Sequence, residues 1–212
     1  MLKNLVKILI ILSFPFNAVF AADIPIIVIA PSKKAQSVST VGTSVVIYDE
    51  NNINSSTDYF LGDVLNFGSP SLNGYQSGGY GTTSGIQLRG LPKRYSTVYI
   101  DGVKMSDPST VSNDYYFDDL LKSQISRVEI LKGNQSSIYG SGAMGGTINI
   151  TTKRGKPGIQ KFFSANTGSN SIYNIAASIA GADEKNDFYI GVERFETEGI
   201  SAMTDNTEKD AY

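Results

Sequence analysis

Residues 127–152 read RVEILKGNQSSIYGSGAMGGTINITT, and this stretch decides the fold of the chain. Its first residues alternate, with Val128 and Ile130 on one face and Arg127 and Glu129 on the other, which predicts a half-buried strand. A run of Gly and Ser follows, and a second alternating segment ends the stretch. The pattern therefore predicts two strands joined by a connection built from small residues.

Residues 140–145, GSGAMG, have the glycine spacing of a dinucleotide-binding fingerprint. That fingerprint requires a helix directly after the glycines and an acidic residue about 20 positions later. Here the alternating Ile148 and Ile150 follow at once, so the spacing is a poor indication of a phosphate site. Glycines that allow positive φ and close backbone approach in a turn explain the run better.

The whole stretch closely resembles the signature that ends the plug domain of TonB-dependent outer-membrane receptors. In that family, R-V-E-I-x-[KR]-G-P is followed by S-x-[LI]-Y-G, A-x-G-G and I-N-I-x-T, and the barrel begins afterwards. The visible departure is Asn134, where the family usually has proline. The resemblance implies a plug domain that leads into a β-barrel.

Composition agrees with an exported β-rich protein and disfavours several other classes. The 212 residues carry a net charge of −2, which argues against nucleic acid as a partner. Cysteine and histidine are absent, so disulfides, thiolate metal sites and His-dependent catalysis are excluded. With 21 Gly, 12 Tyr and 10 Phe, the composition favours a sheet protein over a helical bundle, and we expect no enzyme.

Residues 1–21 have the three parts of a cleaved signal peptide. Lys3 and Lys7 supply the positive region, residues 8–16 form a short apolar region, and small residues around Ala21 offer a cleavage site. The alternative is a membrane anchor, but the apolar run is much shorter than the ~20 residues that span a bilayer. The sequence therefore predicts export without a lipid anchor.

Residues 22–42 are interpreted as a TonB box with its linker. An apolar run stands between Pro25 and Pro31, too short for a helix and suited to strand addition at a sheet edge. It resembles the L-V-V-T-A box of the family, which the TonB energy-coupling protein captures. The alternative is a disordered tail. The resemblance assigns the box to Ile26, Ile27, Val28, Ile29 and Ala30.

Residues 43–154 are predicted to form an α+β plug domain with a small mixed sheet and short helices. We expect a strand at 45–48, a strand at 86–90 and a hairpin at 98–105 that turns at Asp101-Gly102. Both 86–90 and 98–103 resemble motifs of the same family, I-x-I-R-G and V-L-I-D-G-V.

The remaining plug segments are predicted from local signals. Ser56 or Thr57 is expected to cap a helix that runs through Asn66, a Gly/Ser-rich loop is expected at 73–84, and a short helical turn at 118–123.

Residues 155–212 are predicted to hold the first antiparallel strands of a transmembrane barrel, which this chain leaves incomplete. Three β-rich segments, 160–167, 173–180 and 187–196, approach the length of tilted membrane strands. A soluble sheet is the alternative, because the alternation in each segment is a weak signal. Three strands cannot close a barrel, so we expect either a fragment of a longer protein or a truncated gene product.

The resemblance implies a receptor whose plug fills the barrel lumen and moves when TonB pulls the box. It places plug–barrel ionic contacts at Arg89, Arg127 and Glu129. Such pairs bind strongly when partly desolvated. Ordinary solvated strand charges are the alternative.

Two loops are predicted to contact the substrate, because they resemble the substrate loops of the cobalamin receptors in this family. Their candidate residues are Gly78, Gly79, Tyr80, Ser106, Asp107, Tyr115 and Tyr116. Aromatic and small polar groups suit a large amphipathic ligand, so a corrinoid such as cobalamin is favoured and an iron–siderophore is second. Asp205, Glu208 and Asp210 are weak candidates for a calcium loop, with a solvated loop as the alternative; no other cofactor is expected.

The favoured hypothesis is that the chain is the N-terminal part of a monomeric receptor for active uptake, which lies in the outer membrane in contact with its lipid. The rival is a stand-alone or decayed plug-type binding module in the periplasm, without transport. A stand-alone module should end near Arg154, whereas this chain continues into membrane-like strands.

Overall fold

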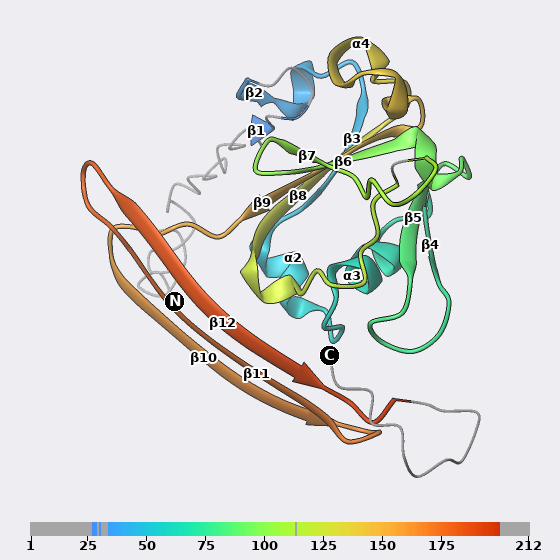
Figure 1. Cartoon of the computed structure of the whole chain (residues 1–212). Coiled ribbons are helices and arrows are strands. Elements are labelled where there is room, and N and C mark those ends of the chain that lie inside the picture. The colour runs from blue at the N-terminus through green and yellow to red at the C-terminus, as the bar shows by residue number, and fades with distance from the viewer. Residues whose placement is uncertain (1–26, 29, 31–33, 113, 200–212) are drawn as a thin grey trace, which may run out of the picture.

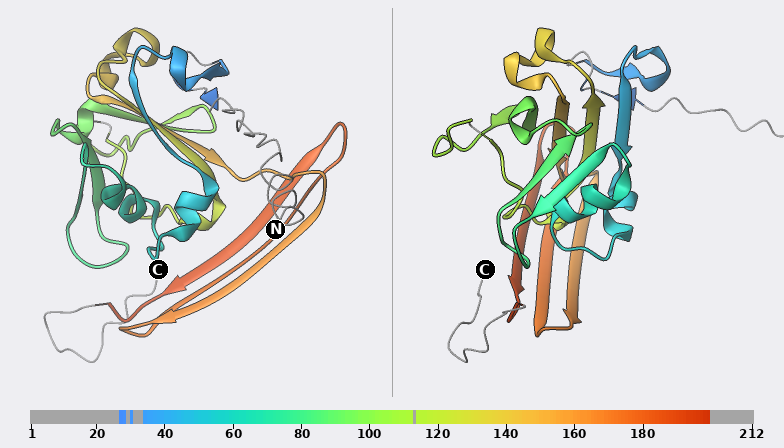
Figure 2. Two further views of the ribbon diagram at one scale, coloured as in Figure 1. Left: turned by 180° about the vertical axis from the view of Figure 1, so that it is seen from behind. Right: turned by 90° about the vertical axis from the view of Figure 1, so that its right-hand side faces the viewer.

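The computed structural model describes residues 27–28, 30, 34–112 and 114–199. A mixed α/β part and a curved antiparallel sheet of three long strands lie side by side (Figures 1 and 2). We refer to these two parts as the plug and the wall. Among the described ranges, no helix is both long enough and apolar enough to cross a bilayer.

The plug is built on a five-stranded sheet in the order β3-β8-β9-β6-β7. Strands β6 and β9 are parallel, and all other neighbours are antiparallel, so the predicted small mixed sheet is confirmed. The five strands are β3 (Ser44–Tyr48), β6 (Ser96–Ile100), β7 (Val103–Met105), β8 (Ile125–Lys132) and β9 (Gly146–Thr152).

One face of this sheet forms the main core. Val128 lies opposite Ile150 and Ile130 lies opposite Ile148, and all four side chains are buried. The period of two therefore sends one set of side chains into the core and leaves Arg127 and Glu129 on the other face. Two helices and a separate hairpin cover the core face (Figure 1).

The helical region differs from the prediction of one helix capped by Ser56 or Thr57. Two helices form, α2 (Glu50–Ser55) and α3 (Leu61–Gly68). Asp49 begins α2, since its carboxylate accepts from the Asn52 amide at 2.8 Å while the Asn52 side chain accepts from the Asp49 amide. Helix α3 starts after Phe60, whose side chain cannot accept a hydrogen bond, so it has no side-chain cap, and Ser56 donates to Asp58.

Two further local predictions were right in kind but wrong in their bounds. Residues 72–76 form strand β4 (Leu72–Gln76), paired with β5 (Ser84–Leu88), so the predicted loop shrinks to residues 77–83. The helical turn expected at 118–123 is a 3-10 turn at Lys122–Gln124. Short 3-10 segments also stand at Val38–Thr40, Lys93–Tyr95 and Ser141–Ala143.

The predicted hairpin and the glycine-rich connection have the expected geometry. Asp101 and Gly102 both have positive φ, 49° and 83°, as the tight turn between β6 and β7 requires. Residues 133–145 contain only one short α-helix, α4 (Ser136–Tyr139), and lead directly into β9. Gly146 has φ of 147°, and an added Cβ would lie 2.2 Å from the Leu131 carbonyl oxygen. The glycine run therefore serves close backbone approach.

The wall consists of β10 (Gly158–Gly168), β11 (Ile172–Ala182) and β12 (Asp187–Glu196), of 11, 11 and 10 residues. All pairs are antiparallel and in continuous register, which confirms the predicted strands. Side chains alternate between the plug and the outside. The outward face exposes apolar residues: Ile159, Phe163, Tyr173, Ile175, Ile179, Phe188, Ile190 and Val192.

Candidate functional site

The N-terminal segment of the described chain docks on the plug. Strand β1 (Ile27–Val28) pairs antiparallel with β2 (Gln36–Ser37), with Ile27 opposite Ser37 and Val28 opposite Gln36. Beyond β1, Ala30 is buried against the face of the sheet that lies opposite the main core. Ile26 and Ile29 of the predicted box lie outside the described residues.

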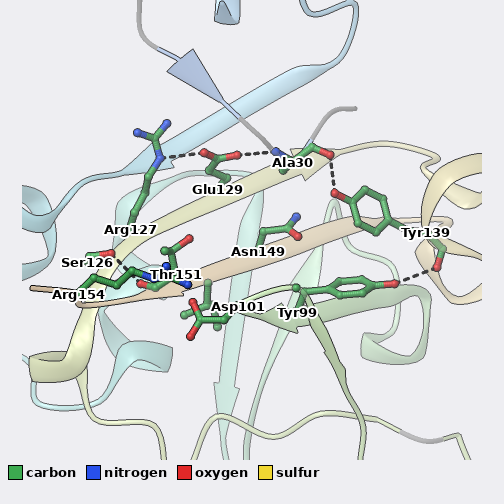
Figure 3. A pocket seen from close by; sticks show the side chains of 12 residues that line it. Ala30, Tyr99, Asp101, Ser126, Arg127, Glu129, Tyr139, Asn149, Thr151 and Arg154 are labelled. Atoms are coloured by element: carbon green, nitrogen blue, oxygen red, sulfur yellow. Dashed lines mark hydrogen bonds and ion pairs between the residues drawn. The ribbon is translucent and has the colours of Figure 1, made fainter. Parts of the chain in front are cut away.

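Two side chains hold both backbone groups of Ala30 (Figure 3). The Ala30 N–H donates to Glu129 Oε2 at 2.8 Å, and the Tyr139 hydroxyl donates to the Ala30 carbonyl at 2.5 Å. We call this arrangement the Ala30 clasp. It satisfies the buried peptide groups with side chains from β8 and α4, where a neighbouring strand would otherwise be needed.

The clasp side chains are themselves held in place. Arg127 Nε lies 2.8 Å from Glu129 Oε1, so each carboxylate oxygen has its own partner. The rings of Tyr99 and Tyr139 are 5.0 Å apart, and the Tyr99 hydroxyl donates to the Tyr139 carbonyl at 3.4 Å. Burial raises the pKa of the Tyr139 phenol, although a hydrogen bond with Asn149 opposes the shift. The phenol therefore stays protonated and able to donate.

A cavity of about 700 Å³ opens beside the clasp. Its size lies within the range of ligand sites, and its lining is mostly apolar with a few charged and hydroxyl groups among it. The lining comprises Ala30, Tyr99, Asp101, Gly102, Ser126, Arg127, Glu129, Tyr139, Asn149, Ile150, Thr151 and Arg154.

The three residues predicted for plug–barrel ionic contacts are not together. Arg127 and Glu129 form a pair, whereas Arg89 lies after β5 with its guanidinium near Gly133, beyond the far end of β8. Their contacts with a barrel stay predictions. The structure does place a polar contact between described residues of plug and wall, in which the Ser123 hydroxyl donates to the Glu193 carboxylate.

An ionic contact joins α2 to the segment that enters the wall. Glu50 pairs with Lys153 at 3.2 Å and with Lys156 at 3.4 Å. Sequence reasoning missed these pairs, and it also missed Tyr139, whose only signal was its place in the S-S-I-Y-G part of the signature.

The predicted substrate loops are well packed. Gly78 and Gly79 are exposed in the β4–β5 loop, but the ring of Tyr80 packs against Phe60 and Phe195. Tyr115 packs its ring 5.0 Å from Phe117 beside the main core.

The second predicted substrate loop, which contains Ser106 and Asp107, is held against the rest of the plug domain through contacts of Lys93 with residues near its end. The Lys93 ammonium lies 3.5 Å from the centre of the Tyr116 ring and 3.4 Å from Asp114. Burial alone would lower the pKa of Lys93, but hydrogen bonds with Tyr116 and Tyr75 and contact with Asp114 raise it. The role of these loops in substrate binding stays a prediction.

Several predictions fall outside the described residues. The signal peptide at 1–21 and the calcium candidates Asp205, Glu208 and Asp210 belong to this group. Within the described part of the chain, no group of three or more Asp or Glu side chains is arranged to hold a metal ion.

Comparison with known proteins places these features in one family. Residues 37–147 match the family described as TonB-dependent Receptor Plug Domain. Among curated proteins, the chain is 28% identical over 200 residues to the vitamin B12 transporter BtuB of Photobacterium profundum, which covers 92% of this chain and 32% of that protein. The chain thus spans about a third of the length of this relative.

Solved structures show the same fold. The ferripyoverdine receptor of the Pseudomonas aeruginosa outer membrane matches with a TM-score of 0.69 at 16% identity, covering 82% of this chain and 23% of the receptor. BauA, the ferric preacinetobactin receptor of Acinetobacter baumannii, matches with a TM-score of 0.67 at 17% identity, covering 82% of this chain and 25% of that chain. At these identities the likeness concerns the fold alone.

Proposed function

Because this chain belongs to the TonB-dependent receptor plug domain family of the outer membrane, we propose that it is the N-terminal part of a receptor for active uptake of a large, scarce nutrient. The plug closes the lumen of a barrel whose first three strands are the wall. We infer that the protein acts as a monomer in contact with outer-membrane lipid and performs no catalysis.

The Ala30 clasp is the observation that carries this proposal. A segment that a partner must capture by strand addition needs free backbone groups. Within the described part of this segment, the two residues of β1 are paired and Ala30 is held by two side chains, so the segment is docked and removable. TonB would capture the segment Ile26, Ile27, Val28, Ile29 and Ala30 after it leaves the clasp, and tension on it would then reach the plug.

The proposed substrate is a corrinoid, with an iron–siderophore as second candidate. The support is the vitamin B12 transporter to which the chain is similar over nearly its whole length. The solved siderophore receptors have lower identity.

Two measurements test the proposal. The purified C-terminal domain of TonB should bind the 212-residue chain, and Val28→Pro should abolish binding because proline removes a backbone donor from β1. Val111→Pro, in an exposed loop away from β1, is the matched control and should bind normally. Equal binding by all three chains would contradict the assignment of the box.

The substrate is tested with the full product of the gene, expressed in cells that lack their own corrinoid receptor. TonB-dependent uptake of labelled cyanocobalamin is the expected result. Uptake of a ferric siderophore in its place would keep the receptor and overturn the corrinoid.

A further inference from the structure

The loop between β4 and β5 is seated on the wall by an aromatic cluster. The Tyr80 ring stacks on Phe60 at 5.8 Å and meets Phe195 of β12 edge to face at 5.5 Å. Phe60 and Phe195 are 5.2 Å apart, and Tyr59 lies 5.0 Å from Phe195. We call Tyr59, Phe60, Tyr80 and Phe195 the aromatic seal. Ile172 of β11 is buried with it.

The seal is the place where apolar side chains join plug and wall. Of the three buried apolar clusters formed by the described residues, only this one contains residues from both parts. Beside it lies a cavity of about 220 Å³, lined by apolar side chains of the seal and by the charged Asp118, Asp119 and Glu193. The cluster is therefore an apolar contact beside an open cavity that also carries charged side chains.

The loop that carries Tyr80 is internally stiff. Three donors converge on the Gly79 carbonyl: the Thr82 amide at 3.3 Å, the Thr82 hydroxyl at 2.8 Å and the Gln76 side chain at 2.6 Å. The Ser77 amide also bonds the Thr83 carbonyl at 3.0 Å. A displacement at the exposed tip, Gly78 and Gly79, is thus passed to the Tyr80 ring instead of being absorbed within the loop.

We propose that the aromatic seal is a releasable closure between plug and wall, and that Tyr80 makes its release depend on the loop at residues 77–83. The inference rests on the proposed receptor function, in which this loop faces the substrate. Dispersion contacts weaken steeply over a gap of an ångström or less. A small shift of the loop therefore weakens all three ring contacts of Tyr80, with Tyr59, Phe60 and Phe195, at once. Among the described residues of the seal, no ion pair has to be separated.

Amide hydrogen exchange of the full product of the gene, folded in detergent micelles, tests the seal without any ligand. Tyr80→Ala should speed exchange at residues 59–61 and 193–196 about tenfold, as expected for loss of its three aromatic contacts. Tyr173→Ala, an exposed ring on the outward face of β11, is the matched control and should change neither segment. Protection of β8 and β9 shows that the variant plug is still folded.

A second variant separates coupling from simple packing. Thr82→Val removes the hydrogen bond from the Thr82 hydroxyl to the Gly79 carbonyl and leaves all four rings of the seal in the chain. If the loop controls the seal, exchange at residues 193–196 should still rise by about threefold. Unchanged exchange there in Thr82→Val refutes the coupling, and unchanged exchange in Tyr80→Ala refutes the seal. Neither result depends on TonB binding or corrinoid uptake, so failure of the receptor function is detected separately.

Discussion

Removing the Glu129 carboxylate should release the N-terminal segment. In Glu129→Ala, the Ala30 amide loses a charged acceptor at 2.8 Å, an interaction of about 2 kcal/mol. The partner left behind, Arg127, has a side chain that is 31% exposed, so water can solvate its charge and adds little to the cost. The ratio of docked to undocked segment should therefore fall about 30-fold.

Milder changes at the clasp should have graded effects. Glu129→Gln keeps a neutral acceptor, and Tyr139→Phe loses one neutral hydrogen bond, so each should lower the ratio about fivefold. Both side chains act on Ala30, so their effects should not be additive in the double variant. The exposed wall carboxylate Glu196, which pairs with Arg194, supplies the control variant Glu196→Gln.

Exchange of the Ala30 amide, followed by NMR, measures this ratio directly, and the affinity for TonB measures its consequence. If capture requires an undocked segment, TonB should bind Glu129→Ala more tightly, up to the factor by which docking is weakened. An Ala30 amide that exchanges at the same rate in Glu129→Ala and in the unaltered chain would refute the clasp. Faster exchange with unchanged affinity would mean that docking does not compete with capture.

Three further predictions concern stability and are read from denaturant unfolding. Burial, with Asp119 and Asp118 nearby, raises the pKa of Tyr115 to about 12 in the folded chain, so as the pH rises the unfolded chain loses this proton first. The contribution of Tyr115 to the free energy of unfolding should therefore be full below pH 10 and fall as the pH rises toward 12. Tyr115→Phe should flatten that fall. Gly146→Ala should cost about 3 kcal/mol or more, since φ is 147° and the Cβ meets a carbonyl, whereas Gly42→Ala, with no atom within 4 Å, should cost little. Asp49→Ala should cost about 1 kcal/mol through loss of the cap on α2.

Strong periodic patterns were read correctly from the sequence. The alternation at 127–130, the Asp101-Gly102 turn and the three wall strands all appear as predicted, because side-chain period and turn chemistry are local properties. The sequence analysis missed helix α2 because its cap, formed by Asp49 with Asn52, lies seven residues before the predicted cap at Ser56. Strand β4 was missed because its polar and glycine residues resemble a loop.

The candidate site was only partly predictable. The pairing of Arg127 with Glu129 follows from their shared face on one strand. The contact of Tyr139 with Ala30 joins residues 109 positions apart, and no local pattern indicates it. The family signature includes Tyr139 without indicating a role, whereas the structure shows its hydroxyl donating to the Ala30 carbonyl. For Tyr80 the sequence did suggest a role, contact with a ligand, but in the structure its ring packs against Phe195 of the wall.

The strand pairings determine how the plug would respond to tension applied at residue 27. The force acts first on the β1–β2 pair and then on the β3–β8 pair, and it loads the two pairs in different directions. In β1–β2 the pulled end, Ile27, lies opposite Ser37, next to the exit toward the plug, so the two pairs peel apart one after the other. In β3 the pulled end, Ser44, pairs with Lys132, which in turn pairs with Gly146 at the start of β9. The sheet is held at the other end of β9, where the chain continues into the wall. The β3–β8 pair is loaded in shear, with all five residue pairs resisting together. Residues 27–43 would thus straighten toward a full length of about 60 Å, at ~3.4 Å per residue, before a large force reaches the sheet.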